Sequence, residues 1–481
     1  MRRRNDISAR AVDRRDRKGA GIPFSKAMKG LLIAVIALLT GLQIYDPSKR
    51  FIEAVVGLII VGIVWNFSGI QAIWFILLTY PFPFGFSWGN STFFFVLVVF
   101  VIYLVHVSTG RYRFHGDRRM NVPIAVMVAA YIISFYNQAG GKMIMDFALL
   151  HTGNFLVILI LYYLLVNLID DEKNLRKTVG YLMVSTWLIT FFSFLELLFP
   201  GRVILPNLIY STHKISLIMK DIRVTGPFRD YELLAEFFAM NVPIIILMIV
   251  RSQRFITRFM YIFLLMGVLF MQFATITRGA FISLIIGIVY MAWICRKDLN
   301  IVRITGLAGA FIILIVIIDA IMTKYTMSGS LFKRLLATTV ERGFIPDTRV
   351  EAWTGAANRW LLHPFIGNGP GWDMTYSFEH KYWPHSAYLY YLNIFGVFGT
   401  AAFLLLLYRL VRASMPELRQ SLVTAPFPRA LMKTLNVSLA ILIVDMIKVD
   451  YQRNPIYMYF IWIFFALISA TRMIIDKQES D

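Results

Sequence analysis

The chain has 481 residues, of which 58% are hydrophobic and only 16% are charged. A soluble globule of this length has no core large enough to hide so much apolar surface, so the composition indicates a polytopic membrane protein. The formal net charge of +20 is explained more simply by contact with anionic lipid headgroups than by nucleic acid, which we do not expect as a partner. A single cysteine, Cys295, excludes a disulfide framework and cysteine-based metal clusters.

Residues 1–29 hold ten Lys or Arg against three Asp and contain no apolar run. This pattern is typical of a solvated tail, which we expect on the cytoplasmic side. Transmembrane helices are expected from 30 to 323 and from 384 to 473, with a short cytoplasmic tail at 474–481. The second group follows a long polar segment at 324–383.

Apolar stretches that approach the length of a membrane span, about 20 residues, recur along the whole chain. They predict an all-α polytopic membrane protein of about 12–14 transmembrane helices. The two prolines after Tyr80 make the third candidate the least regular, because proline breaks a helix. The fourteen candidates are 30–45, 51–66, 69–86, 91–107, 122–137, 148–169, 178–199, 231–250, 259–275, 279–295, 303–323, 384–408, 433–449 and 456–473.

The distribution of basic residues predicts the orientation. With fourteen spans, 30 of the 48 Lys and Arg lie on the same side as the N-terminus, and 12 of the other 18 lie in two long segments, 200–230 and 324–383. Long translocated segments are largely exempt from the positive-inside rule. We therefore predict that both termini are cytoplasmic and that these two segments are loops on the outer face.

The loop 324–383 shows two helical patterns. Leu331, Phe332, Leu335 and Leu336 recur beside Lys333 and Arg334, which predicts an amphipathic helix on the outer leaflet. A second pattern runs from 350 to 361 and stops at a turn rich in glycine and proline, 363–371.

The stretch Trp383–Leu407 begins the next span and carries His385 and Ser386 at the water boundary. Pro384 is expected in the first helical turn, where its missing N–H is harmless. Gly396 and Gly399 would let a neighbouring helix approach closely. Arg223, Arg278 and Arg349 fall on the same face as His385 in the predicted topology. Permanent cations beside one titratable ring suit a phosphorylated, lipid-linked substrate.

Four pieces of sequence resemble the O-antigen ligase and polymerase superfamily, in the order found in that family. They are RVTGPFRDYELLAEF from Arg223, TRGAFISL from Thr277, RVEAWTGAANRWLLHPFIGNGPG from Arg349, and PHSAYLYYLNIFGVFG from Pro384. The spacing from His385 to Gly396 and Gly399 resembles the ligase pattern in particular. The chain departs from the family at Arg229-Asp230-Tyr231-Glu232, where relatives often carry an asparagine, and at Ser386, where many have asparagine.

The resemblance implies a multi-pass enzyme of the bacterial inner membrane with its active site on the periplasmic face. Its donor would be a glycan on undecaprenyl diphosphate, and its acceptor a lipid A core sugar or another lipid-linked glycan. The implied roles are His385 as catalytic base and Arg223, Arg278 and Arg349 as donor diphosphate-binding residues. Glu232 and Ser386 are candidates for acceptor contacts, and Glu232 is the alternative base. Ligase and polymerase use the same donor site, so both functions stay open.

These roles agree with what the chemistry requires. Arginine forks match phosphate oxygens and stabilise a leaving diphosphate without a metal. Histidine can take the proton of an acceptor hydroxyl. The predicted outer loops contain no Asp-x-Asp and no acidic cluster suited to Mg²⁺, so we predict a metal-independent glycosyltransferase without cofactors.

Each residue also has a structural interpretation. His385 could cap its helix, Arg278 could be a snorkelling anchor and Arg223 could belong to a solvated loop. Arg349 could pair with Glu351 or Asp347. Glu232 and Glu236 could face a polar cavity or pair with Arg229, and Asp445, Lys448 and Asp450 suit a local charge network without a chemical role. At the level of the whole protein, a flippase for lipid-linked oligosaccharides and a non-enzymatic scaffold are the remaining alternatives.

Overall fold

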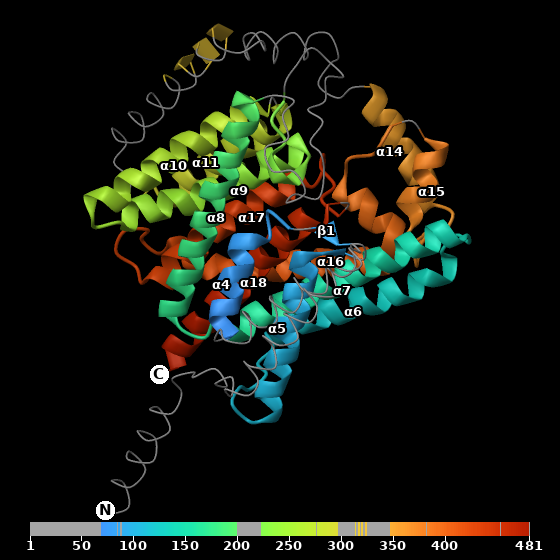
Figure 1. Ribbon diagram of the computed structural model, residues 1–481, viewed down its shortest axis with the longest axis horizontal. Helices are drawn as coiled ribbons and strands as arrows, with labels where there is room; N and C mark the ends of the chain where they lie inside the picture. The colour runs from blue at the N-terminus through green and yellow to red at the C-terminus, as the bar shows by residue number, and fades with distance from the viewer. Residues whose placement is uncertain are drawn as a thin grey trace, which may run out of the picture.

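The computed structural model describes residues 69–83, 85–86, 89–199, 223–275, 277–296, 347–380, 382–452 and 454–480, with a few positions between 313 and 324. Apart from one two-residue β ladder, β1 (Gly85–Phe86) with β2 (Gly89–Asn90), the regular structure in these ranges is helical. Nine of the described helices are long and apolar enough to cross a membrane. The chain is therefore an all-helical, multi-pass membrane protein (Figure 1).

Eleven of the fourteen predicted spans coincide with described helices. Two of these helices, α4 (Gly69–Thr79) and α11 (Arg278–Ile294), are shorter than the nine long ones. The nine are α5 (Ser91–Ser108), α6 (Arg118–Ser134, continued by η1, Phe135–Asn137), α7 (Lys142–Leu168), α8 (Glu172–Leu198), α9 (Tyr231–Arg251), α10 (Phe255–Ala274), α16 (Ala387–Ser414, continued by η3, Met415–Arg419), α17 (Phe427–Asp445) and α18 (Pro455–Ser480).

The other predictions for these regions have mixed outcomes. Candidates 30–45 and 51–66, most of 303–323, the tail 1–29 and the amphipathic pattern at 331–336 lie outside the described residues. The third candidate is cut short as its prolines suggested, because α4 ends at Thr79, just before Tyr80-Pro81.

Local sequence signals explain several helix starts. Asn and Asp side chains are favoured N-caps because their oxygens accept bonds from the first N–H groups of a helix. Four long helices begin in this way, capped by Asn90, Asp117, Asp171 and Asp230.

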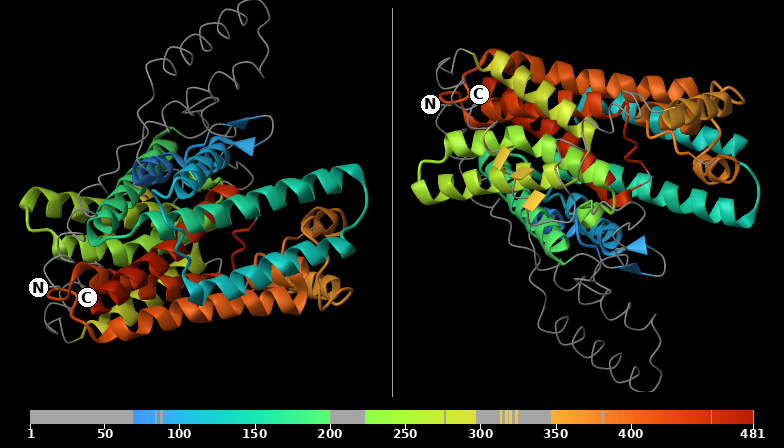
Figure 2. Two further views of the ribbon diagram at one scale, coloured as in Figure 1. Left: turned by 90° about the horizontal axis from the view of Figure 1, so that it is seen from below. Right: turned by 90° about the horizontal axis from the view of Figure 1, so that it is seen from above.

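Helix α18 forms the centre of the bundle. All its residues from 456 to 471 are buried, as expected of a helix that is apolar on every side. It packs on α7 and α17, and α9 packs on α10 and α17. By contrast, α10 exposes Phe255, Ile256 and Phe259, an apolar surface that suits lipid and not water. Figure 2 shows α6 and α7 (teal) running beside α16 (orange) along the molecule.

The described part of the loop 324–383 covers one end of this bundle. It contains α14 (Asp347–Trp360), which confirms the second predicted helical pattern, and α15 (Trp372–Glu379), which was not predicted. The turn expected at 363–371 lies between them. Both helices lie beside the ends of α6 and α7 in Figures 1 and 2.

Two predictions about α16 need correction. The helix begins at Ala387, so Pro384 lies before the first turn and not within it. Gly396 has φ 65° and kinks the helix, and a Cβ there would collide with the backbone of Phe365 in the loop. Gly396 therefore admits a loop and not a neighbouring helix. Gly399 fits the prediction better, because a Cβ there would lie 3.0 Å from Ala130 Cβ on α6.

Candidate functional site

His385 lies in a short connection between α15 and α16 that is fixed on both sides. Its φ of 43° is in the left-handed region, which is uncommon outside glycine and marks strain that the surroundings must hold. The indole N–H of Trp353 on α14 donates to the Pro384 carbonyl at 2.6 Å. The Ala387 N–H donates to the carbonyls of Met446 and Val449, each at 3.0 Å. The histidine backbone is therefore clamped between α14 and the end of α17.

Ser386, and not His385, is the N-cap residue of α16. Its side chain is buried and makes no capping hydrogen bond. The interpretation of His385 as a helix cap is therefore wrong, and the proposed contact of Ser386 with an acceptor stays a prediction.

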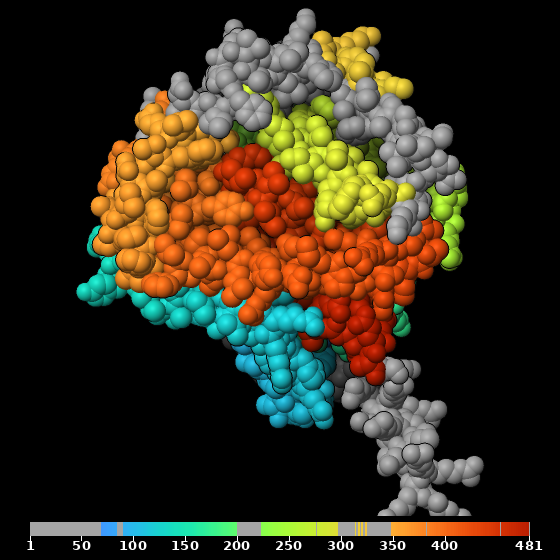
Figure 3. All heavy atoms as spheres, turned by 180° about the vertical axis from the view of Figure 1, so that it is seen from behind, coloured from blue at the N-terminus to red at the C-terminus, as the bar shows by residue number. Residues whose placement is uncertain are grey.

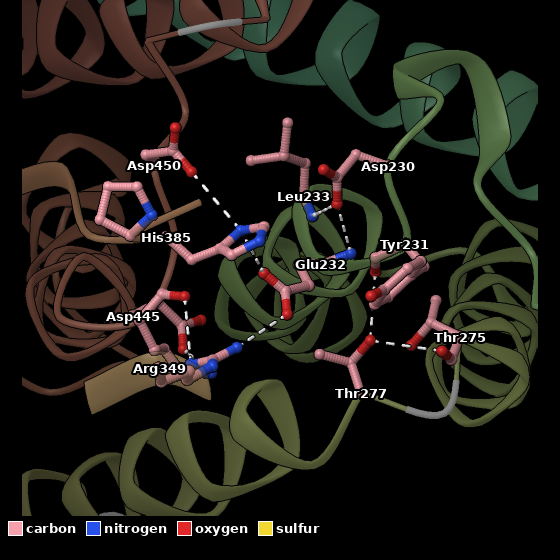
Figure 4. A network of polar contacts seen from close by, with 12 residues as sticks. Asp230, Tyr231, Glu232, Leu233, Thr275, Thr277, Arg349, His385, Asp445 and Asp450 are labelled. Carbon is pink, nitrogen blue, oxygen red and sulfur yellow. Dashed lines mark hydrogen bonds and ion pairs between the residues drawn. The ribbon is translucent and has the colours of Figure 1, made fainter. Parts of the chain in front are cut away.

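Two carboxyl groups face one nitrogen of the His385 ring (Figure 4). Nδ1 lies 3.4 Å from Glu232 Oε2 and 3.7 Å from Asp450 Oδ1. Asp450 also accepts a hydrogen bond from the Trp383 indole at 2.6 Å. A carboxylate beside Nδ1 favours the tautomer that carries its proton there, which leaves the lone pair on Nε2 for a base reaction.

Glu232 joins His385 to Arg349. It lies at the start of α9, where Asp230 accepts hydrogen bonds from the backbone N–H groups of Glu232 and Leu233 at 2.7 and 3.2 Å. Arg349 Nη2 donates to Glu232 Oε1 at 2.9 Å. Oε2 is buried and accepts no hydrogen bond from the described residues. Three predicted site residues, from α9, α14 and the start of α16, therefore meet in one chain of contacts.

Arg349 reaches this cluster from the outer loop. Its guanidinium also donates to the carbonyl of Lys448, just after α17, at 3.5 Å. Sequence analysis offered Glu351 or Asp347 as its partner within the loop, and the structure places it in an ion pair with Glu232.

Arg223 and Arg278 lie at the edge of the same cluster. The guanidinium carbon of Arg223 lies 4.6 Å from the ring centroid of Tyr231, the first residue of α9. Arg278 is the first residue of α11, and the hydroxyl of Thr277 before it donates to the Tyr231 carbonyl at 3.3 Å. The structure thus brings all three predicted arginines to the end of the bundle where α9 begins.

Glu196 is a positioning residue that sequence analysis missed. From the end of α8 it accepts hydrogen bonds from the Thr225 hydroxyl at 2.8 Å and the Gly226 N–H at 2.7 Å. These bonds fix the segment that follows Arg223. An acidic residue near the end of an apolar span was the available signal, because such a residue is rarely left without a structural or functional role.

The charge network predicted for Asp445, Lys448 and Asp450 extends into the site. Lys448 Nζ lies 2.5 Å from Asp445 Oδ1, and Ser283 on α11 donates to the same carboxylate. Lys448 also lies against Gly279, where a Cβ would collide with its side chain. Lys448 is thus a fourth basic side chain at this end of the bundle, next to the backbone that follows Arg278, although the sequence suggested no chemical role for it.

Glu236 lies one helical turn beyond Glu232 and is fully buried. Neither of its oxygens accepts a hydrogen bond from the described residues. Acidic residues inside a span seldom lack a structural or functional role, so Glu236 extends the acidic cluster that begins at Glu232.

The prediction of a metal-independent reaction stays a prediction. Within the described ranges, no three His, Cys, Asp or Glu side chains are placed to hold one metal ion. No protein-family model matches the chain, and no curated protein is significantly similar to it.

Proposed function

We propose that the chain is a membrane glycosyltransferase that moves a glycan from a polyprenyl diphosphate to an acceptor hydroxyl. The observation that supports this most is the contact chain of Arg349, Glu232 and His385 with Asp450 at one end of an apolar bundle. A base beside several permanent cations meets the two needs of the reaction, deprotonation and stabilisation of diphosphate.

In the proposed reaction the acceptor oxygen attacks the anomeric carbon of the donor sugar. The bond from that carbon to the phosphate oxygen breaks, and its electron pair leaves with the diphosphate. His385 takes the hydroxyl proton, and Glu232 and Asp450 stabilise the resulting imidazolium. The arginines bind the phosphate oxygens, whose negative charge grows as the bond breaks.

The depth of the site supports a lipid-borne donor. Twenty-two residues separate Ala387 from Arg409 on α16, which corresponds to at most about 33 Å at the helical rise, because the kink at Gly396 shortens the span. The hydrocarbon layer is about 30 Å thick. If Arg409 marks one boundary, His385 lies near the phosphate groups of the opposite leaflet.

The location follows from the same proposal. We infer a bacterial inner membrane with both termini cytoplasmic, about 12–14 spans, and the His385 site on the periplasmic face. The basic-residue distribution and the superfamily resemblance support this topology. Ligase activity toward a lipid A core acceptor is our first choice, because the spacing of His385, Gly396 and Gly399 resembles the ligases. Polymerisation of the lipid-linked repeat is the alternative.

The test uses the full-length protein in proteoliposomes with a fluorescent glycan on undecaprenyl diphosphate. We expect a new glycosidic bond, made with lipid A core for a ligase or with a second donor molecule for a polymerase. Relocation of unchanged donor to the other leaflet would identify a flippase. Failure to consume donor with either acceptor would contradict the proposal.

A further inference from the structure

An exposed apolar surface lies beside the kink of α16. On the turn after α14, Leu361, Leu362 and Phe365 are 60%, 64% and 64% exposed, and Phe398 on α16 is 60% exposed. The rings of Phe365 and Phe398 are 6.1 Å apart. We call residues 361–365, which also include the exposed His363, the apolar turn. Figure 3 shows the light-orange α14 and α15 region at one end of the orange band that contains α16.

The apolar turn is attached to α16 through its backbone. The N–H of Val397 donates to the Pro364 carbonyl at 2.9 Å, and that of Phe398 donates to the Phe365 carbonyl at 3.4 Å. Gly367 permits the contact from the loop side, because with φ 78° it lies so close to the Ile394 carbonyl that a Cβ would collide. The depth of the turn is therefore set by the depth of Gly396.

Helix pairing fixes the position of Gly396 along α6. Arg409 on α16 donates to the Arg119 carbonyl at the start of α6, and Gly399 faces Ala130 further along the same pair. Thirteen residues separate Gly396 from Arg409, or about 20 Å along the helix. In a hydrocarbon layer about 30 Å thick with Arg409 at one boundary, the docking point lies about 10 Å inside the other.

A non-helical segment survives at that depth only if its backbone groups are hydrogen-bonded. The N–H groups of Leu361, Leu362 and His363 donate to carbonyls of α14 at 3.0, 3.2 and 3.0 Å. The Pro364 carbonyl also accepts from the Trp360 indole at 3.0 Å. The turn thus directs apolar side chains outward while much of its backbone is satisfied within the protein.

We propose that the apolar turn is a re-entrant segment whose Leu361, Leu362 and Phe365 side chains lie among the lipid acyl chains of the leaflet on the His385 side. It continues the exposed apolar stripe of α16, where Val397, Leu404 and Leu405 are also exposed. Insertion would hold α14, and with it Arg349, at a constant depth in the membrane. This inference requires only that the bundle crosses a bilayer, so it is independent of the reaction at the site.

The test is spin-label accessibility in nanodiscs, in a Cys295→Ser background because Cys295 is the sole cysteine. A label at Leu362→Cys should collide several-fold more often with oxygen, which partitions into lipid, than with a water-soluble nickel chelate. Leu404→Cys on α16 is the lipid-facing control, and Thr354→Cys, on an exposed position of α14, is the aqueous control.

Two results would overturn the inference. In the first, the Leu362 label behaves like the Thr354 label. In the second, its protection from nickel disappears when each nanodisc holds one chain, which would show that a second copy covers the turn instead of lipid. Preference for oxygen in single-chain nanodiscs would support insertion.

Discussion

Charged clusters at the two ends of the bundle differ in how completely they are paired. At the end where α16 finishes, three arginines form ion pairs with three carboxylates. Arg472 lies 3.2 Å from Glu417 and 2.5 Å from Asp476. Arg119 lies 2.8 Å from Asp476, and Arg429 lies 3.1 Å from Glu479. Of those carboxylates, a single oxygen, Glu417 Oε2, is buried without a hydrogen bond from the described residues.

The His385 end is less well satisfied. Four buried carboxyl oxygens there accept no hydrogen bond from the described residues: Glu232 Oε2, both oxygens of Glu236, and Asp445 Oδ2. Native proteins pair nearly all buried polar groups, so each exception needs a reason. A matched network stabilises helix ends, whereas an incompletely paired one with a strained histidine suits binding and proton transfer. Pairing, and not charge alone, therefore distinguishes the candidate site.

Replacing Gly396 by alanine should have the largest structural effect at the His385 end. Its positive φ and the close approach of the Phe365 backbone should cost more than about 3 kcal/mol together. The control is Gly180→Ala in α8, where a Cβ meets nothing, and where alanine should stabilise the helix by up to about 1 kcal/mol. Thermal melting in detergent measures both. Equal melting temperatures for the two variants would show that the loop does not depend on the kink.

Arg349→Lys should reduce turnover about 10- to 100-fold, because a lysine cannot reproduce a fork that binds Glu232 and phosphate together. Arg472→Lys makes the same change in the paired network and should leave turnover unaltered. Measuring donor consumption at limiting donor compares the two ends directly. Similar losses in both variants would mean that Arg349 is only structural.

Glu196→Gln should destabilise the protein by about 1–2 kcal/mol, because the buried carboxylate that accepts bonds from Thr225 and Gly226 is lost. Glu172→Gln changes the other end of the same helix. That residue pairs with Arg176 on the surface, so the control should cost less than about 0.5 kcal/mol. If Glu196→Gln changes the melting temperature as little as the control does, Glu196 does not support the segment that follows Arg223.

Asp230→Asn should have the smallest effect on the melting temperature, and the size of that effect should depend on pH. Burial, reinforced by the neighbouring Glu232, raises the pKa of the Asp230 carboxyl above its ordinary value. The folded state therefore binds more protons than the unfolded state between the two pKa values, and stability falls as pH rises through that window. Asparagine keeps the N-cap without a charge, so its advantage in melting temperature should grow from acid toward neutral pH. An advantage that shrinks as pH rises would reverse this account.

Much of the fold could be predicted from the sequence because apolar length is a strong signal. Eleven span candidates match helices. Asn90 and Asp230, residue types that favour the N-cap position, lie directly before two of these helices. Gly396 was misinterpreted because sequence spacing cannot distinguish a glycine that admits a helix from one that needs a positive φ. Helix α15 was missed because its eight residues are too few to show a clear period.

Sequence analysis named some residues of the candidate site but none of the contacts between them. His385, Arg349 and Glu232 were each chosen from sequence, yet their contacts join residues more than 100 positions apart, which no local pattern encodes. Lys448 and Asp450 looked like a local network because their nearest sequence neighbours are charged. The three-dimensional approach of α11 and α14 to the end of α17 adds them to the site.

The most direct test of the account is turnover by His385→Asn, with donor binding and melting temperature measured on the same protein. Asparagine tolerates the left-handed backbone at this position better than most residues, so the substitution removes the ring with little added strain. We predict that turnover falls by about 10² to 10⁴, the usual contribution of a positioned base, while donor binding and melting temperature change little. A folded, donor-binding His385→Asn protein with near wild-type turnover would contradict the account and leave Glu232 as the next candidate base.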